Sequence, residues 1–216
     1  MQRIVRPVLS SLLVAVTLAA TLLALASWAN APLPQKSMHL TRTAAFILKA
    51  PFADAIIIGD SRVQGAEPTH RALLAGYNGA TFPELERIAG LLCRLSDAPV
   101  VIALGVNDAR VERRDIAASL ASAERTVQAC TADGVAVSAI WPTDPDTEPF
   151  GDYYDLDAFA AMDLGLAAIA SEHGVPVIPH PEISGHTHDG VHFTPEVSRL
   201  YIDTLADGVA LVKPRR

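Results

Sequence analysis

Residues 55–68 read AIIIGDSRVQGAEP, an apolar run that ends at Gly59 and changes at once to the polar triplet Asp60, Ser61 and Arg62. An apolar run without alternation is typical of a strand that is covered on both faces, as in a parallel sheet. In such sheets, ligands bind outside the carboxyl ends of the strands. The stretch therefore predicts a buried parallel strand followed by a loop with a candidate functional serine.

The chain downstream of this stretch alternates apolar runs with helical periods. Further strands are expected at residues 73–77, 99–105, 135–141 and 175–178, and helices at 83–95, 115–132, 156–173 and from Pro195, capped by Thr194, to about Val212. Strands that alternate with helices indicate a parallel sheet wrapped on both sides. We predict an α/β fold, a flavodoxin-like three-layer α/β/α sandwich with a parallel sheet of about five strands.

Composition and charge restrict the class of protein. Half of the 216 residues are apolar, which is typical of a folded domain and excludes extensive disorder. The formal net charge is -7, and since residues 1–31 hold two arginines and no acid, the remainder carries -9. An acidic body repels phosphates, so nucleic acid is excluded as a partner class.

The N-terminal residues 1–31 are expected to lie outside the folded domain. Val8–Trp28 is an uncharged apolar stretch, long enough to cross a bilayer as a hydrophobic helix, and Arg3 and Arg6 before it orient the N-terminus toward the cytoplasm. This pattern predicts an inner-membrane signal anchor with the rest of the chain in the periplasm. The small residues at 29–31 leave open a cleaved signal peptide and a secreted or periplasmic protein.

Between this segment and the first strand, residues 32–50 are interpreted as a linker that passes into a short helix or lead-in. The predicted catalytic domain then covers residues 51–216.

A serine at the end of a strand can act as a nucleophile only if a base lies beside it. Ser61 is expected to begin a helix, whose dipole and backbone N–H would stabilise an oxyanion formed on attack. In HTHDGVHFTPE, residues 186–196, His192 follows Asp189 by three residues, which allows the carboxylate to accept from one imidazole nitrogen while the other faces the serine. The alternative is that Asp60 or Ser61 only caps a helix.

The histidines of the same region suggest a metal site as an alternative. Four histidines fall between residues 180 and 192, namely His180, His186, His188 and His192. Their spacing matches no recognised zinc pattern, and a solvated loop with incidental histidines is the other interpretation. We expect no metal and no other cofactor.

Acyl transfer also needs hydrogen-bond donors for the developing oxyanion. Gly79 would offer a backbone N–H on a tight turn, and Asn107 a side-chain amide from the loop after the third strand. Either residue could instead be present only because it favours a turn, since Asn-Gly is a common turn pair.

Four motifs together resemble a known family. IIIGDSR, NGATFPE, ALGVND and DGVHFTPE occur in the order of blocks I, II, III and V of the SGNH (GDSL-like) hydrolase superfamily, and the resemblance covers residues 55 to about 212. It implies that Ser61 is the nucleophile, His192 the general base and Asp189 the group that orients His192. It also implies an oxyanion hole made by the Ser61 N–H, Gly79 and Asn107, with no cofactor.

The motif departs from the family at one position and gives Asp60 a structural role. The usual leucine after the serine is Arg62 here. A permanently charged side chain at this place either meets an anionic or sugar substrate or lies solvated on the first helical turn. By the resemblance, Asp60 forms structural hydrogen bonds and is not the triad acid.

The loop WPTDPDTEPFGDYYD, residues 141–155, adds a second candidate for substrate contact. It is acidic and aromatic, and Trp141, Phe150, Tyr153 and Tyr154 would either stack on sugar rings or pack over the core.

The resemblance and the expected location favour an esterase acting on acyl esters, in particular O-acetyl groups of envelope or extracellular carbohydrate. One alternative is an O-acetyltransferase of an exported polysaccharide, with the same intermediate and a membrane acyl-donor partner. Another is a glycan-binding or assembly subunit without catalysis.

The two cysteines are separate from these motifs. Cys93 and Cys130 lie near the ends of two helices that, in a flavodoxin-like winding, flank the third strand on one face of the sheet. Outside the cytoplasm such a pair closes into a disulfide or remains two small buried side chains.

Overall fold

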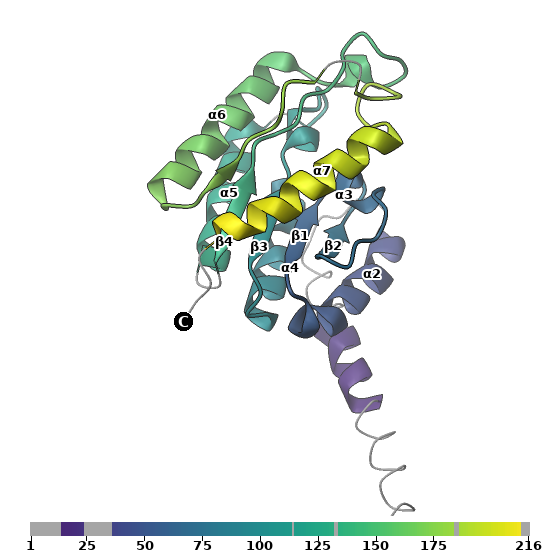
Figure 1. Ribbon diagram of the computed structural model, residues 1–216, viewed down its shortest axis with the longest axis vertical. Helices are drawn as coiled ribbons and strands as arrows, with labels where there is room; N and C mark the ends of the chain where they lie inside the picture. Colours follow the sequence, from purple (N-terminus) through teal and green to yellow (C-terminus); the bar gives the residue numbers. More distant parts are fainter. Residues whose placement is uncertain (1–13, 24–35, 114, 132–133, 184–185, 213–216) are drawn as a thin grey trace, which may run out of the picture.

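The computed structural model describes residues 14–23, 36–113, 115–131, 134–183 and 186–212 (Figure 1). Their centre is a parallel five-stranded sheet in the order β2-β1-β3-β4-β5, which confirms the flavodoxin-like fold predicted from the alternation of strands and helices. The strands are β1 (Ile56–Gly59), β2 (Leu73–Gly76), β3 (Val100–Ala103), β4 (Val135–Ser138) and β5 (Val177–Ile178).

Helices cover both faces of this sheet (Figure 1). One face packs against α2 (Lys36–Lys49), α4 (Phe82–Leu95), α5 (Ile116–Thr131) and α6 (Leu156–Glu172), and the other against α3 (Ser61–Gln64) and α7 (Pro195–Gly208). Successive side chains of β1 serve the two faces, since Ile56 and Ile58 belong to the first core and Ile57 to the second. Both faces are therefore apolar, as the unbroken apolar runs predict.

Short 3-10 turns connect several of these elements. They are η1 (Ala50–Phe52), η2 (Val106–Ala109), η3 (Gly151–Tyr153) and η4 (Val209–Leu211). Thr194 caps α7 as predicted, because its side chain accepts a hydrogen bond from the Val197 N–H and Pro195 occupies the first turn.

The short helix or lead-in expected within residues 32–50 is a longer helix, which begins at Lys36. That stretch is the 14-residue helix α2, and His39, Thr43 and Ile47 along one side of it are buried. Thr43 contacts the Tyr77 hydroxyl at 3.1 Å, just beyond the end of β2. The helix was underestimated because two of these three buried side chains are polar, which weakens the apolar periodicity on which a helix prediction depends. The folded domain therefore includes α2.

The N-terminal prediction falls mostly outside the described residues. Of the apolar stretch Val8–Trp28, residues 14–23 are described and are helical, and Ala20 among them is buried. Within the described ranges, no helix combines the length and apolar character that a membrane crossing requires.

The two cysteines form a disulfide that joins Cys93 of α4 to Cys130 of α5. The helices lie next to each other on the same face of the sheet, as the winding predicts. This cross-link closes a 37-residue separation that contains β3 and the loop with Asn107. It therefore constrains one of the segments that carries a candidate site residue.

Candidate active site

The candidate nucleophile lies at a sharp strand-to-helix turn. Ser61 is the first residue of α3, directly after β1, and the Asp60 side chain caps this helix by accepting a hydrogen bond of 2.9 Å from the Arg62 N–H. Asp60 is thus a structural cap, as the resemblance implies. Burial raises the pKa of Asp60, although the charge of Arg62 opposes this effect.

Two glycines make this turn possible. A Cβ atom on Gly59 would lie 2.2 Å from Val63 Cγ2, and one on Gly76 would lie 2.2 Å from the backbone nitrogen of Gln64. The two glycines are register partners at the ends of β1 and β2, so α3 runs closely over both strands. Sequence reasoning missed this role, although each apolar run visibly ends in glycine.

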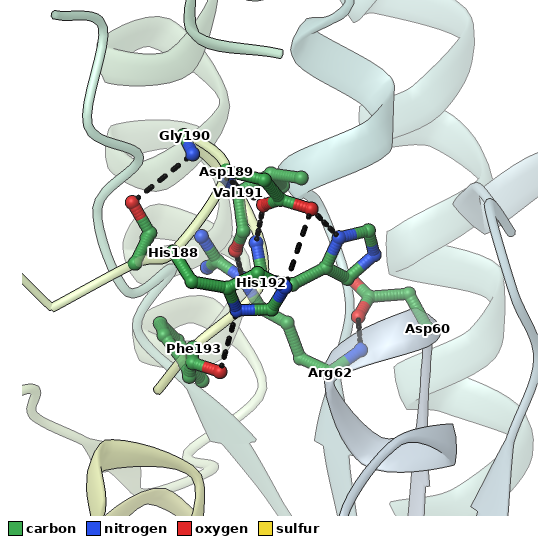
Figure 2. Close-up of polar contacts among 9 residues, drawn as sticks. Asp60, Arg62, His188, Asp189, Gly190, Val191, His192 and Phe193 are labelled. Carbon is green, nitrogen blue, oxygen red and sulfur yellow. Dashed lines mark hydrogen bonds and ion pairs between the residues drawn. The ribbon is translucent and has the colours of Figure 1, made fainter. Parts of the chain in front are cut away.

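The candidate base and its orienting acid form a direct contact (Figure 2). His192 Nδ1 lies 2.7 Å from Asp189 Oδ2, while the other carboxylate oxygen accepts the N–H groups of Val191 and His192 at 3.1 and 2.7 Å. Burial would raise the pKa of Asp189, but the hydrogen bonds from His192 and Val191 outweigh it and hold this pKa below its usual value. The carboxylate is therefore charged and oriented by its own loop.

A neighbouring loop holds this pair in place. The Asp144 N–H donates to Gly190 O at 2.8 Å, and the Phe150 N–H donates to Asp189 O at 2.9 Å. Gly190 has a φ of +93°, and a Cβ there would lie 2.4 Å from the Gly151 nitrogen. The aromatic loop 141–155 thus packs against the loop of Asp189, and glycine is needed both for the backbone conformation and for the contact.

Arg62 joins α3, the helix that begins at Ser61, to both of these loops, so the two predictions for its side chain are wrong. Its guanidinium donates from Nε to Val191 O at 2.9 Å, from Nη1 to Trp141 O and from Nη2 to Pro142 O at 2.9 Å. It also lies over the Phe193 ring, 4.3 Å from the centroid. A side chain that is 4 % exposed with its donors engaged is neither solvated nor free to contact a substrate.

Trp141 is likewise not a substrate contact. Its ring is 1 % exposed and packs edge-on against Tyr201, with ring centroids 5.0 Å apart. The pattern of the loop 141–155 did not reveal which aromatic residues turn inward, because that depends on the α7 surface beneath it.

Other aromatic side chains of this loop do reach the surface beside the histidine. Phe150 is 39 % exposed and lies edge-on to His192 with ring centroids 6.2 Å apart, and Tyr153 is 48 % exposed and packs on Phe150. Tyr154 is half-buried and packs against the core. The prediction that these aromatics divide between core and surface therefore agrees with the structure.

The serine and the histidine come from opposite ends of the domain's sequence, and the residues next to them in the chain are in contact. Arg62, next to Ser61, bonds the carbonyl next to His192, and the charge of His192 acts on Asp60. No hydrogen bond between the Ser61 hydroxyl and His192 is present in the described part of the chain. Such contacts often tighten only when substrate binds.

The candidate oxyanion donors also lie side by side. Gly79 occupies a turn with a φ of +68°, and the Asn107 amide donates to the carbonyl of Ala80, the next residue, at 3.2 Å. Gln64 of α3 accepts the N–H of Asn78 at 2.7 Å, and so ties this turn to the helix that begins at Ser61. Because an amide nitrogen carries two N–H groups, Asn107 retains one for a substrate oxygen.

A buried carboxylate that sequence reasoning did not single out supports this loop. Asp108, fully buried after Asn107, accepts the Phe82 N–H at 3.2 Å and thereby fixes η2 to the start of α4. Burial is the main cause that raises the pKa of Asp108 to about 7, and the charges of Asp60 and Glu84 add to it. Asp108 belongs to the motif ALGVND, but the motif does not show that its side chain is buried.

This raised pKa predicts a pH dependence of stability. Between the ordinary value of 3.8 and about 7, the folded protein binds more protons at Asp108 than the unfolded chain, so stability falls as pH rises through that range. Asp108→Asn keeps an acceptor for Phe82 and removes the titration. We expect its free energy of unfolding, relative to the natural protein, to increase from pH 4.5 to pH 7.5, by at most about 1.4 kcal/mol per pH unit. Urea unfolding at both pH values measures this, and parallel curves would contradict it.

The four histidines do not converge on one point. His186 Nε2 bonds Pro142 O at 2.9 Å, and His180 bonds the carbonyl of Pro181, whereas His188 and His192 both approach Asp189. Among the described residues, no three histidine, cysteine, aspartate or glutamate side chains are grouped as metal ligands.

Comparison with solved structures shows which known proteins share this fold. No protein-family model matches the chain. No curated protein matches it either. Among solved structures, it is similar to a lipase/acylhydrolase from Enterococcus faecalis, at 19% identity and a TM-score of 0.60 over 75% of this chain and 98% of that one.

Two further structures are similar over nearly the same length. One is a GDSL-like lipase from Bacteroides thetaiotaomicron, with 18% identity and a TM-score of 0.61 over 73% of this chain and 87% of that one. The other is a carbohydrate acetylesterase from Sinorhizobium meliloti, with 17% identity and a TM-score of 0.59 over 73% and 98%. The fold implied by the resemblance to the SGNH hydrolases is therefore confirmed.

Proposed function

We propose that the protein is a serine esterase of the SGNH type, which cleaves ester-linked acyl groups through an acyl-Ser61 intermediate. The observation that carries this proposal is the 2.7 Å contact between His192 and Asp189, on a loop that Arg62 ties to the helix beginning at Ser61. A carboxylate that fixes one imidazole nitrogen leaves the other free to act as a base on a nearby hydroxyl.

The proposed reaction has two halves. His192 Nε2 takes the proton of the Ser61 hydroxyl while its oxygen attacks the ester carbonyl, and the resulting oxyanion is stabilised by the Ser61 N–H, the Gly79 N–H and the Asn107 amide. The C–O bond to the alcohol then breaks, and the alcohol leaves with the proton from His192. In the second half, water attacks the acyl-serine by the same route, releasing the acid and restoring Ser61.

The substrate class proposed is O-acetyl groups on envelope or extracellular carbohydrate. Phe150 and Tyr153 support it, because they expose aromatic surface beside His192, and the sugar ring of such an ester has an apolar face that stacks on aromatics. If a sugar hydroxyl replaces water in the second half, the same intermediate makes the protein an O-acetyltransferase, supplied by a membrane acyl donor.

The proposed location rests on sequence alone. Arg3 and Arg6 followed by the apolar stretch Val8–Trp28 favour a membrane anchor, or a cleaved signal, with the domain in the periplasm. N-terminal sequencing of the protein recovered from membrane and soluble fractions distinguishes the two.

Covalent labelling tests the nucleophile. The full-length chain in mild detergent is treated with a fluorophosphonate, and its intact mass is compared with that of Ser61→Ala, His192→Ala and the control Ser171→Ala, an exposed serine of α6. We expect a single adduct in the natural protein and the control, and none in the other two, because only an activated serine reacts at an appreciable rate.

The outcomes separate the candidate functions. A folded natural protein without adduct would contradict the esterase proposal and favour a glycan-binding or assembly subunit. With an adduct, incubation with acetylated oligosaccharides gives free acetate if water is the acceptor and a newly acetylated glycan if the protein is a transferase.

A further inference from the structure

A groove of about 670 Å³ lies between α7 and the loop that follows α3. Gly65 and residues 67–70 line one side, residues of α7 between Pro195 and Asp203 line the other, and His188 and Phe193 complete the lining. The volume falls in the range of small-molecule sites, roughly 300–1,000 Å³. Neither the proposed triad nor the oxyanion donors line it, so it is distinct from the reaction centre.

The groove is nevertheless connected to the reaction centre through His188. The Nε2 atom of His188 lies 3.6 Å from Asp189 Oδ2, the same oxygen that His192 contacts, and the two imidazole rings are stacked with centroids 6.1 Å apart (Figure 2). The groove is also lined by Gly65, whose N–H bonds the Ser61 carbonyl at 2.8 Å. The groove is therefore linked to the loop of the candidate base through His188 and to the helix of the candidate nucleophile through Gly65.

The chemistry of the walls favours a neutral, hydroxyl-rich ligand. Phe193 and Ile202 provide apolar surface, Glu67 and Arg199 bring opposite charges to the two walls, and the Asp203 carboxylate of α7 is paired with Arg71. No ion pair within the described residues engages either Glu67 or Arg199, and both side chains are exposed. Charges of both signs disfavour a strongly anionic or cationic ligand, whereas a carboxylate and a guanidinium are good partners for vicinal hydroxyls.

His188 is held at the groove by two contacts. Its Nδ1 lies 3.2 Å from the Phe193 carbonyl, which can only accept, so Nδ1 donates in this contact. Its Nε2 lies 3.6 Å from Asp189 Oδ2, so the imidazole ring connects the groove to the carboxylate that His192 contacts.

We propose that this groove binds the carbohydrate part of the ester, with Glu67 and Arg199 as hydrogen-bonding groups and His188 at the end nearest the reacting bond. This inference rests on the proposed function and specifies where its substrate is held. A sugar ring fits it because such a ring combines an apolar C–H face with hydroxyls around its rim. The groove then sets the specificity for the alcohol part of the ester, and the reaction centre acts on the acyl part.

Kinetics with two substrates test the assignment. In the variant Glu67→Gln/Arg199→Gln we expect the KM for acetylated xylo-oligosaccharides to rise about tenfold, since each lost charged hydrogen bond weakens binding severalfold, with kcat unchanged. The kcat/KM for p-nitrophenyl acetate, which has no sugar, should stay the same. Glu196→Gln is the matched control, because this exposed residue lies on α7 outside the groove.

A KM that rises equally for both substrates, or for neither, would overturn the groove proposal while leaving the esterase proposal intact. A failure of the esterase proposal is recognised by a separate measurement. Should p-nitrophenyl acetate not be cleaved at all, binding of unacetylated xylo-, cello- and chito-oligosaccharides to Ser61→Ala protein is measured by titration calorimetry. The groove predicts binding that weakens about tenfold in the Glu67→Gln/Arg199→Gln background, and either no binding or unaltered binding refutes it.

Discussion

Replacing Asp189 with asparagine is expected to lower kcat by about 10⁴-fold while the fold is retained, the loss typical when the acid of a serine triad becomes an amide. The local geometry gives the reason. Asp189 Oδ1 accepts two backbone N–H groups, so the amide oxygen must occupy that position and the NH2 group must face His192 Nδ1. His192 would then accept at Nδ1 and carry its proton on Nε2, where it cannot take the proton of Ser61.

Steady-state hydrolysis of p-nitrophenyl acetate measures this effect, and urea unfolding verifies that the variant is folded. Asp115→Asn is the matched control, because Asp115 also accepts a backbone N–H, from Ala118, but at the exposed start of α5. A decrease of less than tenfold in the Asp189 variant, with an unchanged control, would show that His192 does not depend on this carboxylate.

The second large effect is expected at Arg62. Arg62→Leu, which introduces the residue usual in the resembling family, removes the donors of three backbone carbonyls, those of Trp141, Pro142 and Val191. Leaving buried acceptors unsatisfied costs about 1–3 kcal/mol each, so we expect the free energy of unfolding to fall by about 3 kcal/mol or more. The loop with His192 loses its tie to α3, and a displacement of about 1 Å reduces kcat by up to about 10²-fold.

If Arg62 positions the loop of His192 and does not only stabilise the fold, its replacement must slow the reaction of protein that is still folded. Arg62→Leu should lower kcat and the rate of fluorophosphonate labelling at temperatures where the protein is still folded, with the KM for p-nitrophenyl acetate little changed. Arg62→Lys keeps the charge but not the planar fork, and should recover only part of both losses. Arg125→Leu, which breaks an exposed ion pair with Glu86, is the control and should change stability much less than Arg62→Leu. Labelling at the natural rate in folded Arg62→Leu protein would refute the positioning role.

Much of the fold was predictable because its signals are local. The runs at 55–58 and 99–105 are apolar without alternation, and β1 and β3 are accordingly buried on both faces. The cap at Thr194 and the helical period after Pro83 likewise depend on neighbours within a few residues. Spacing alone also placed Asp189 and His192 together, since a separation of three residues around a glycine brings their side chains into contact.

The positions that sequence reasoning missed depend on distant parts of the chain. Gly59 and Gly76 are required because α3 passes over the ends of β1 and β2. The apolar sequence of each strand does not show which segment packs over it. The full length of helix α2 is not evident from the sequence because its buried His39 and Thr43 are polar, and only the adjoining Tyr77 gives Thr43 a partner. Burial by a segment far along the chain is not encoded in a local pattern.

By itself, the sequence determined the parallel α/β architecture, the order of the candidate catalytic motifs and the pairing of Asp189 with His192, because each follows from short-range periodicity or spacing. Only the tertiary structure decided the role of Arg62, which the sequence places beside Ser61 and which the fold turns inward to carbonyls 79 to 129 residues away. A buried guanidinium needs acceptors, and those acceptors exist only where the loops after β4 and β5 come together over α3.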